Sequence, residues 1–174
     1  MGLFELLDII KDELNFKATV KILIEINFMF SSLNNNIFLK VYHVHPNARV
    51  FNEILIRLIN EEDNQDKMIK MFLCLRNILD NKKENILYST ELESLIDIII
   101  IKLQIAESEL MPFIIDIIEK ITIYPEYHRT MYKIDEILYF FADFACDNDT
   151  VEELVKLKSK KIFETLSQTK KEKL

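Results

Sequence analysis

The sequence predicts an all-α protein, an armadillo- or HEAT-like stacked helical domain of about nine helices. Apolar residues recur at helical spacing along most of the 174-residue chain. Gly2 is the only glycine, and the chain has only three prolines. Turns that need positive φ and bulged sheets are therefore disfavoured. Several segments are apolar on most sides, as expected for helices that share a core with their neighbours. A compact irregular helical bundle would give a similar pattern.

The first quarter of the chain contains two predicted helices and one ambiguous segment. Apolar residues at positions 3, 6, 7, 10 and 14 form one stripe, which predicts a helix over residues 3–14. Residues 17–30 are apolar on most sides and predict a helix packed between neighbours, which the asparagines at 34–36 end. Residues 37–44 fit a helix or an extended chain equally well.

The middle of the chain contains three further predicted helices. Pro46 can occupy a first helical turn, so we expect a helix from Pro46 to Asn60, followed by a polar loop over 61–66. Met68, Phe72, Leu75 and Leu79 form one stripe, which predicts a helix over 68–79. After a short helical turn at 86–88, Thr90 and Glu93 have capping-box spacing and open a helix to about Ala106.

The last third of the chain repeats these signals. Ser108 can cap a helix over 111–123, with Pro112 in its first turn, and Pro125 ends it. A short piece around Tyr127 leads into a helix over 134–146. Thr150 and Glu153 again have capping-box spacing and open a last helix to about Leu166.

Length and charge predict one domain over residues 1–168 and a basic tail over 169–174. Residues 151–174 hold seven lysines and four glutamates, whereas the rest carries 15 of the 22 basic and 25 of the 29 acidic side chains. The preferred interpretation of this end is a solvated terminus, and an interaction arm is the alternative.

Charge, hydropathy and cysteine positions argue against nucleic-acid binding, membrane insertion and disulfide bonds. A net charge of −7 argues against nucleic acid, because binding to phosphates depends on lysine and arginine. The amino end lacks the features of a signal peptide, and the apolar run Ile98–Ile101 is far shorter than a bilayer span. Cys74 and Cys146 lie in apolar stretches, where an unpaired cysteine is usually a small buried hydrophobe. We therefore expect no membrane insertion, no disulfide and a cytoplasmic location.

Candidate catalytic and metal-binding residues are few. Phosphate cradles, nucleophile elbows and dinucleotide turns all need glycine at the point of close approach. His43 and His45 are a weak metal pair without further ligands, and a loop before Pro46 is the preferred interpretation. The histidine at position 128 is interpreted as a surface residue at a helix start.

Three acidic features could indicate a functional site. Asp97 and Asp116 lie among isoleucines, where a buried carboxylate would have a raised pKa, but a single charge on a narrow polar face is the preferred interpretation. The acidic run 61–63 resembles a calcium loop only in its charge. The sequence thus predicts no enzyme, no metal and no cofactor.

Three segments resemble one known family. Residues 51–60 (FNEILIRLIN), 87–99 (LYSTELESLIDII) and 127–137 (YHRTMYKIDEI) are similar, in the same order and at similar spacing, to blocks of the armadillo-like leucine-rich domain of the Nck-interacting SH3-domain protein family and its fungal relatives. The resemblance covers roughly residues 48–142. Departures from the family pattern are Glu61 and Glu62, where the family has basic or glycine residues, and the absence of an SH3 module from this chain.

The resemblance implies a non-catalytic regulator of the actin cytoskeleton. Members of that family bind the actin-related protein 2/3 complex and switch it on without a pre-existing filament, which seeds linear actin filaments. Interface candidates in the last block are Arg129, Tyr132, Lys133 and Asp135, for which helix capping and solvation is the alternative. Two other functions remain open: a generic helical-repeat adaptor, and a small enzyme that uses Asp97, Asp116 or the histidines.

Overall fold

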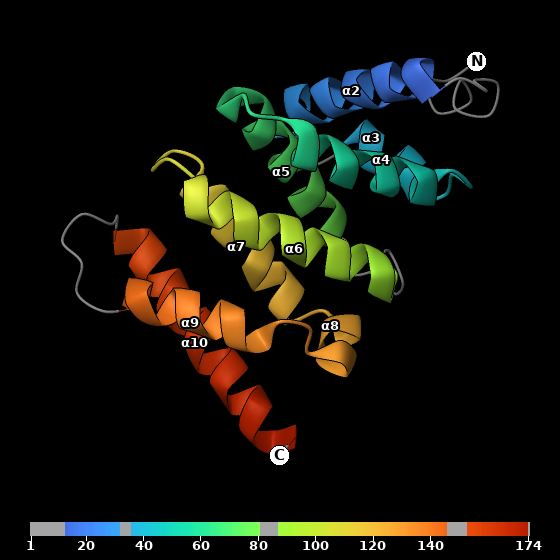
Figure 1. The fold of residues 1–174 in the computed structure, drawn as a ribbon. Coiled ribbons are helices and arrows are strands. Elements are labelled where there is room, and N and C mark those ends of the chain that lie inside the picture. The colour runs from blue at the N-terminus through green and yellow to red at the C-terminus, as the bar shows by residue number, and fades with distance from the viewer. Residues whose placement is uncertain (1–12, 32–35, 81–86, 146–152, 174) are drawn as a thin grey trace. The chain divides into compact units, whose positions relative to one another are not determined.

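The computed structural model describes residues 13–31, 36–80, 87–145 and 153–173, and all regular structure within these ranges is helical (Figure 1). The nine described helices are α2 (Glu13–Met29), α3 (Ile37–Tyr42), α4 (Ala48–Glu61), α5 (Gln65–Asp80), α6 (Ser89–Ile105), α7 (Met111–Thr122), α8 (Pro125–Thr130), α9 (Ile134–Ala145) and α10 (Glu153–Lys173). The predicted all-α class is confirmed, whereas the likeness to armadillo or HEAT repeats stays a prediction. No helix in the described ranges is both long and apolar enough to span a bilayer.

The chain divides into two compact units, Met1–Leu87 and Tyr88–Leu174. In the first unit, α2 packs against α3, α4 and α5, and α4 packs against α5. Large side chains of α4 and α5 fill its core; Phe51, Leu55, Ile59, Phe72, Leu75 and Ile78 are almost fully buried. Two ion pairs tie α2 to its neighbours, Lys17 with Glu61 at 2.9 Å and Lys70 with Glu25 at 2.8 Å.

Three asparagines join α2, α3 and α5 in the first unit. The fully buried Asn27 accepts hydrogen bonds through its Oδ1 from the Nδ2 groups of Asn36 (2.9 Å) and Asn77 (3.3 Å). Asn36 in turn caps α3, because its Oδ1 accepts from the Leu39 N–H at 3.4 Å. This cap explains why residues 37–42, ambiguous in the sequence, form a helix.

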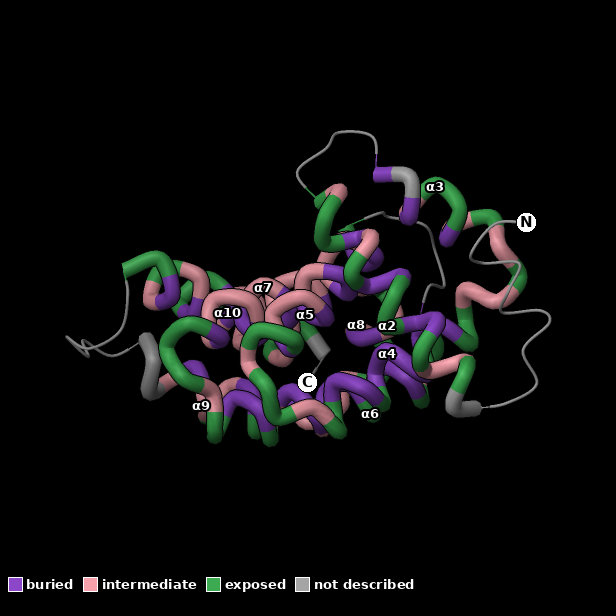
Figure 2. Tube along the Cα trace, turned by 90° about the horizontal axis from the view of Figure 1, so that it is seen from above, coloured by how far each residue is buried: buried purple, intermediate pink, exposed green. Residues whose placement is uncertain are grey.

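In the second unit, α6, α7 and α8 contact one another, and α10 packs on both α7 and α9. The buried residues of α10 recur every three or four positions, at Val155, Ser159, Ile162 and Leu166, so one stripe of this 21-residue helix faces the core. Figure 2 shows the resulting alternation of buried and exposed stretches along the helices. The basic helix α10 is thus built into the unit.

Ion pairs across the second unit balance the charge of α10. Lys158 pairs with Asp116 and Lys161 pairs with Glu119 at 2.7 Å, both on α7. A third lysine, Lys170, pairs with Asp135 of α9. The last helix runs to Lys173, beyond the expected end near Leu166.

Other boundaries differ from the sequence predictions by about a turn or less. The predicted helix over 3–14 lies mostly outside the described residues, as do Thr150 and the start of the predicted last helix. Tyr88 is extended (φ −82°, ψ 164°) where a helical turn was predicted, and α6 starts at Ser89. Its capping carboxylate is that of Glu91, which accepts from the Tyr88 N–H at 2.8 Å, and not that of Glu93.

Candidate protein-interaction surface

The connection from α8 to α9 has an unusual backbone. Pro125 occupies the first turn of α8, and the fully buried Tyr127 anchors this short helix. Two non-glycine residues then adopt the left-handed conformation, Met131 (φ 52°) and Lys133 (φ 51°). Such residues cost free energy and persist only where surrounding contacts hold them. The chain thus turns here through two left-handed residues.

Side chains from α6 and α9 hold this turn. The Tyr132 hydroxyl lies 3.3 Å from Asp97 Oδ2, and the Lys133 Nζ lies 3.1 Å from Asp97 Oδ1 and 3.5 Å from Glu136 Oε2. Asp97 therefore joins α6 to the start of α9 across 35 residues of sequence. We call Asp97, Tyr132, Lys133 and Glu136 the corner cluster.

Electrostatics within the corner cluster favour the protonated forms of Tyr132 and Lys133. The hydrogen bond to Asp97 raises the pKa of the Lys133 ammonium. Loss of hydration, together with the hydrogen bond to Asp97, raises the pKa of the Tyr132 hydroxyl. The Lys133 Nζ also lies 5.8 Å from the centre of the Tyr132 ring. Asp97 thus lies half-exposed beside a cation, in a setting unlike the buried carboxylate of the enzyme hypothesis.

The other two predicted interface residues lie outside this cluster. Arg129 donates to Glu126 at 3.0 Å, and Glu126 also accepts from the Ser89 hydroxyl, whose hydrogen bond lowers the pKa of that carboxyl. Asp135 pairs with Lys170 of α10. The structure therefore brings Tyr132 and Lys133 together and directs Arg129 and Asp135 to separate partners.

Exposed apolar side chains continue from the corner cluster along α6. Ile101 and Ile105 follow Asp97 at spacings of four and eight residues, so the three share one helix face, and their exposed fractions are 53% and 65%. We call Ile101 and Ile105 the α6 strip. These two residues were not among the predicted interface residues. The four consecutive isoleucines at 98–101 are nevertheless a signal, because they cannot all face one core.

The histidines and Cys74 lie outside this surface. His45 Nδ1 accepts from the Asn47 N–H at 3.2 Å, as expected of a loop before Pro46, and the His43 ring lies edge-on to Tyr42. His128 lies in α8 beside Tyr127. Cys74 is buried, and burial raises the pKa of its thiol, whereas Cys146 lies outside the described residues.

Acidic candidates outside this surface pair with lysines. Asp116 bonds Lys158, and Glu61 and Glu62 lie near Lys17 and Lys67. Within the described ranges, no three His, Cys, Asp or Glu side chains gather in a way that could hold a metal ion.

Comparison of the chain with protein-family models, curated proteins and solved structures finds no significant match.

Proposed function

We propose that this protein is a non-catalytic binding module that docks onto the actin-related protein 2/3 complex through the corner cluster and the α6 strip. The proposal combines the family resemblance of three sequence blocks with a surface to which residues of two of these blocks contribute. It also implies action in the cytoplasm, at the actin cytoskeleton.

The main support for the proposal is the contact between two of the resembling blocks. Asp97 belongs to the block 87–99, and Tyr132 and Lys133 belong to the block 127–137. Their side chains lie 3.1–3.3 Å apart although the blocks are separated in sequence. A partner that recognises both blocks would therefore find them on one surface.

The composition of this surface supports protein binding. Exposed apolar side chains that are bordered by charged groups are typical of binding sites, where apolar anchors contribute affinity and the polar rim contributes specificity. Ile101 and Ile105 supply the anchors, and Lys133 with Asp97 supplies the adjoining charges. Binding through such a surface is also sufficient for an allosteric activator, because activation needs only a preference for the active state of the partner.

Direct binding to the purified actin-related protein 2/3 complex tests this proposal. We expect the double substitution Ile101→Asp with Ile105→Asp to weaken binding by about tenfold or more, since each change buries a charge in the contact. Ile22→Asp is the matched control, because Ile22 is a 50% exposed isoleucine of α2 in the other unit. Absence of binding by the unmodified protein, or an equal loss in the control, would contradict the proposal.

The α6 strip also supports a second candidate function. A helical adaptor for a different protein would use the same exposed isoleucines, because their exposure does not depend on the family resemblance. Failure to bind the actin-related protein 2/3 complex, combined with capture of another protein that Ile101→Asp abolishes, would favour the adaptor.

A further inference from the structure

Exposed apolar and acidic side chains adjoin where α6 ends and the chain turns into α7. The α6 strip is followed by Glu107 and Glu109, and both glutamates are exposed. Neither carboxylate has a hydrogen bond or an ion pair within the part of the chain that the structure describes. The buried Leu110 anchors this turn, and its N–H donates to the Glu107 carbonyl at 3.1 Å. We call the α6 strip together with Glu107 and Glu109 the acidic patch.

The first turns of α10 carry the opposite charge beside exposed apolar side chains. Leu154 and Leu157 are 55% and 67% exposed. Leu157 lies three residues before Lys160, which lies four residues after Lys156, so these side chains are neighbours on the helix surface. Neither lysine has an ion pair in the described ranges, and the acidic Glu153 stands at the helix start, where the helix dipole favours a negative charge. We call Leu154, Lys156, Leu157 and Lys160 the basic patch.

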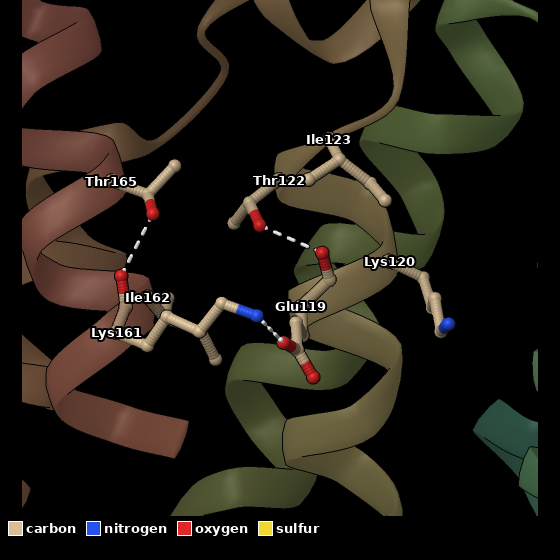
Figure 3. A pocket seen from close by; sticks show the side chains of 7 residues that line it. All are labelled: Glu119, Lys120, Thr122, Ile123, Lys161, Ile162 and Thr165. Atoms are coloured by element: carbon tan, nitrogen blue, oxygen red, sulfur yellow. Dashed lines mark hydrogen bonds and ion pairs between the residues drawn. The ribbon is translucent and has the colours of Figure 1, made fainter. Parts of the chain in front are cut away.

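Both patches border the start of α7. Lys158 of α10 pairs with Asp116 of α7. Three residues further along each helix, Lys161 pairs with Glu119 (Figure 3). The two helices therefore run parallel and in step, so the first turns of α10 lie beside the first turn of α7. Since the acidic patch leads directly into that turn, both patches lie at the same end of this unit.

The two patches do not neutralise each other within one molecule. Among the described residues, no ion pair joins a lysine of the basic patch to a carboxylate of the acidic patch. Each patch combines two exposed apolar side chains with two unpaired charges of one sign. Such surfaces repel a copy of themselves and attract a surface of the opposite sign.

We propose that two copies of this chain associate through this end of the unit, with the acidic patch of each copy on the basic patch of the other. Because both patches lie at the same end of one molecule, the same pairing occurs twice and closes a two-fold dimer. The contact removes exposed isoleucine and leucine surface from water and places each glutamate pair opposite a lysine pair. An interface of this small size gives a weak, concentration-dependent dimer.

A second copy is the occupant that both patches favour together. It supplies to each patch the opposite charge and further apolar side chains. Nucleic acid or an anionic lipid surface would match the basic patch alone and would bring negative charge towards the acidic patch. A basic segment of another protein would match the acidic patch and leave the basic patch uncovered.

This inference goes beyond the proposed function and needs no family resemblance. Because the α6 strip belongs to the acidic patch, self-association and binding of another protein through this strip exclude each other. The test contains only copies of this chain, so the inference and the proposed function can fail separately.

Sedimentation velocity of the 174-residue chain over a range of concentrations tests the inference. We expect a reversible shift from monomer to dimer, which added salt weakens because it screens the charges. Glu107→Lys with Glu109→Lys should weaken the dimer by about tenfold or more, and so should Lys156→Glu with Lys160→Glu. A variant that combines all four changes should regain the dimer, since every charge again faces the opposite sign.

Asp63→Lys with Asp66→Lys is the matched control, because it makes the same change in net charge at exposed positions of the other unit. It should leave the dimer unchanged. Thermal unfolding checks that each variant remains folded. The inference is overturned if the unmodified chain stays monomeric at every concentration, if either folded double variant dimerises as tightly as the unmodified chain, or if the folded fourfold variant stays monomeric.

Discussion

At the scale of single residues, the turn between α8 and α9 concentrates backbone strain. Met131 and Lys133 both have positive φ, and a left-handed conformation costs a non-glycine residue roughly 1–2 kcal/mol. Contacts hold both residues in place. The Met131 N–H donates to the Tyr127 carbonyl at 2.8 Å, and the Lys133 ammonium lies between Asp97 and Glu136. The geometry of the proposed surface depends on these contacts.

This strain predicts the effect of removing a Cβ atom. Met131→Gly should be more stable than Met131→Ala by about 1 kcal/mol, because only glycine adopts positive φ without steric cost. Alanine is the proper reference, since both variants lose the same methionine side chain. Urea unfolding of the two variants measures the difference. Equal stability, or a more stable alanine variant, would show that the left-handed conformation is not strained.

The corner cluster also predicts a dependence on pH. Folding raises the pKa of Tyr132 and of Lys133 above their ordinary values of 10.0 and 10.5. Their stabilisation is therefore complete below those values and is lost as the pH rises through the raised pKa values. Asp97→Asn should lower both pKa values and make the stability fall less steeply in alkali.

Tyrosine ring shifts followed by NMR, together with urea unfolding across the alkaline range, measure this effect. Asp63→Asn is the control, since it removes an exposed carboxylate of the other unit. The same alkaline dependence in the Asp97→Asn variant and the unmodified protein would exclude Asp97 as the cause.

Part of the surface was predictable from single residues. Tyr132 and Lys133 were predicted as interface residues because they are polar positions in a resembling block, and Asp97 was notable as a lone charge among isoleucines. The pairing of these residues was not predictable, because it joins helices 35 residues apart through tertiary packing. Arg129 and Asp135 are polar positions of the same block, but the structure pairs them with Glu126 and Lys170 and not with Asp97.

At the scale of elements, apolar periodicity predicted most helices to within a turn. It failed where a helix end depends on partners distant in sequence. The end of α10 is an example: its last turns are polar in sequence, but Lys170 pairs with Asp135 of α9 and the helix continues to Lys173. Similarly, α3 depends on Asn36, which is both its cap and a partner of Asn27 in α2.

The asparagine network between α2, α3 and α5 predicts that substitution of Asn27 strongly lowers the stability of the protein. Asn27→Ala should destabilise the protein by about 1–3 kcal/mol, because it leaves the amides of Asn36 and Asn77 without their shared acceptor. Asn60→Ala, at an exposed position of α4, is the matched control and should change stability by less than about 0.5 kcal/mol. Urea unfolding compares the two, and a similar small loss in both would mean that the network contributes little.

At the scale of the whole molecule, the proposed interaction surface lies in the unit Tyr88–Leu174. The corner cluster and the α6 strip involve α6, the turn before α9 and the first turn of α9. The remaining resembling block, residues 51–60, lies in α4 of the other unit, where Phe51, Leu55 and Ile59 are core residues. Side chains of that block thus serve packing, whereas the other two blocks also contribute residues to the proposed surface.

Assembly of pyrene-labelled actin with purified actin-related protein 2/3 complex, and without preformed filaments, measures whether this protein activates the complex. If the proposed function is right, the unmodified protein binds the complex and accelerates nucleation. The double variant Ile101→Asp with Ile105→Asp should lose this acceleration, and Ile22→Asp should retain it. Unchanged nucleation together with no direct binding, or full activity of the folded double variant, would contradict the proposed function.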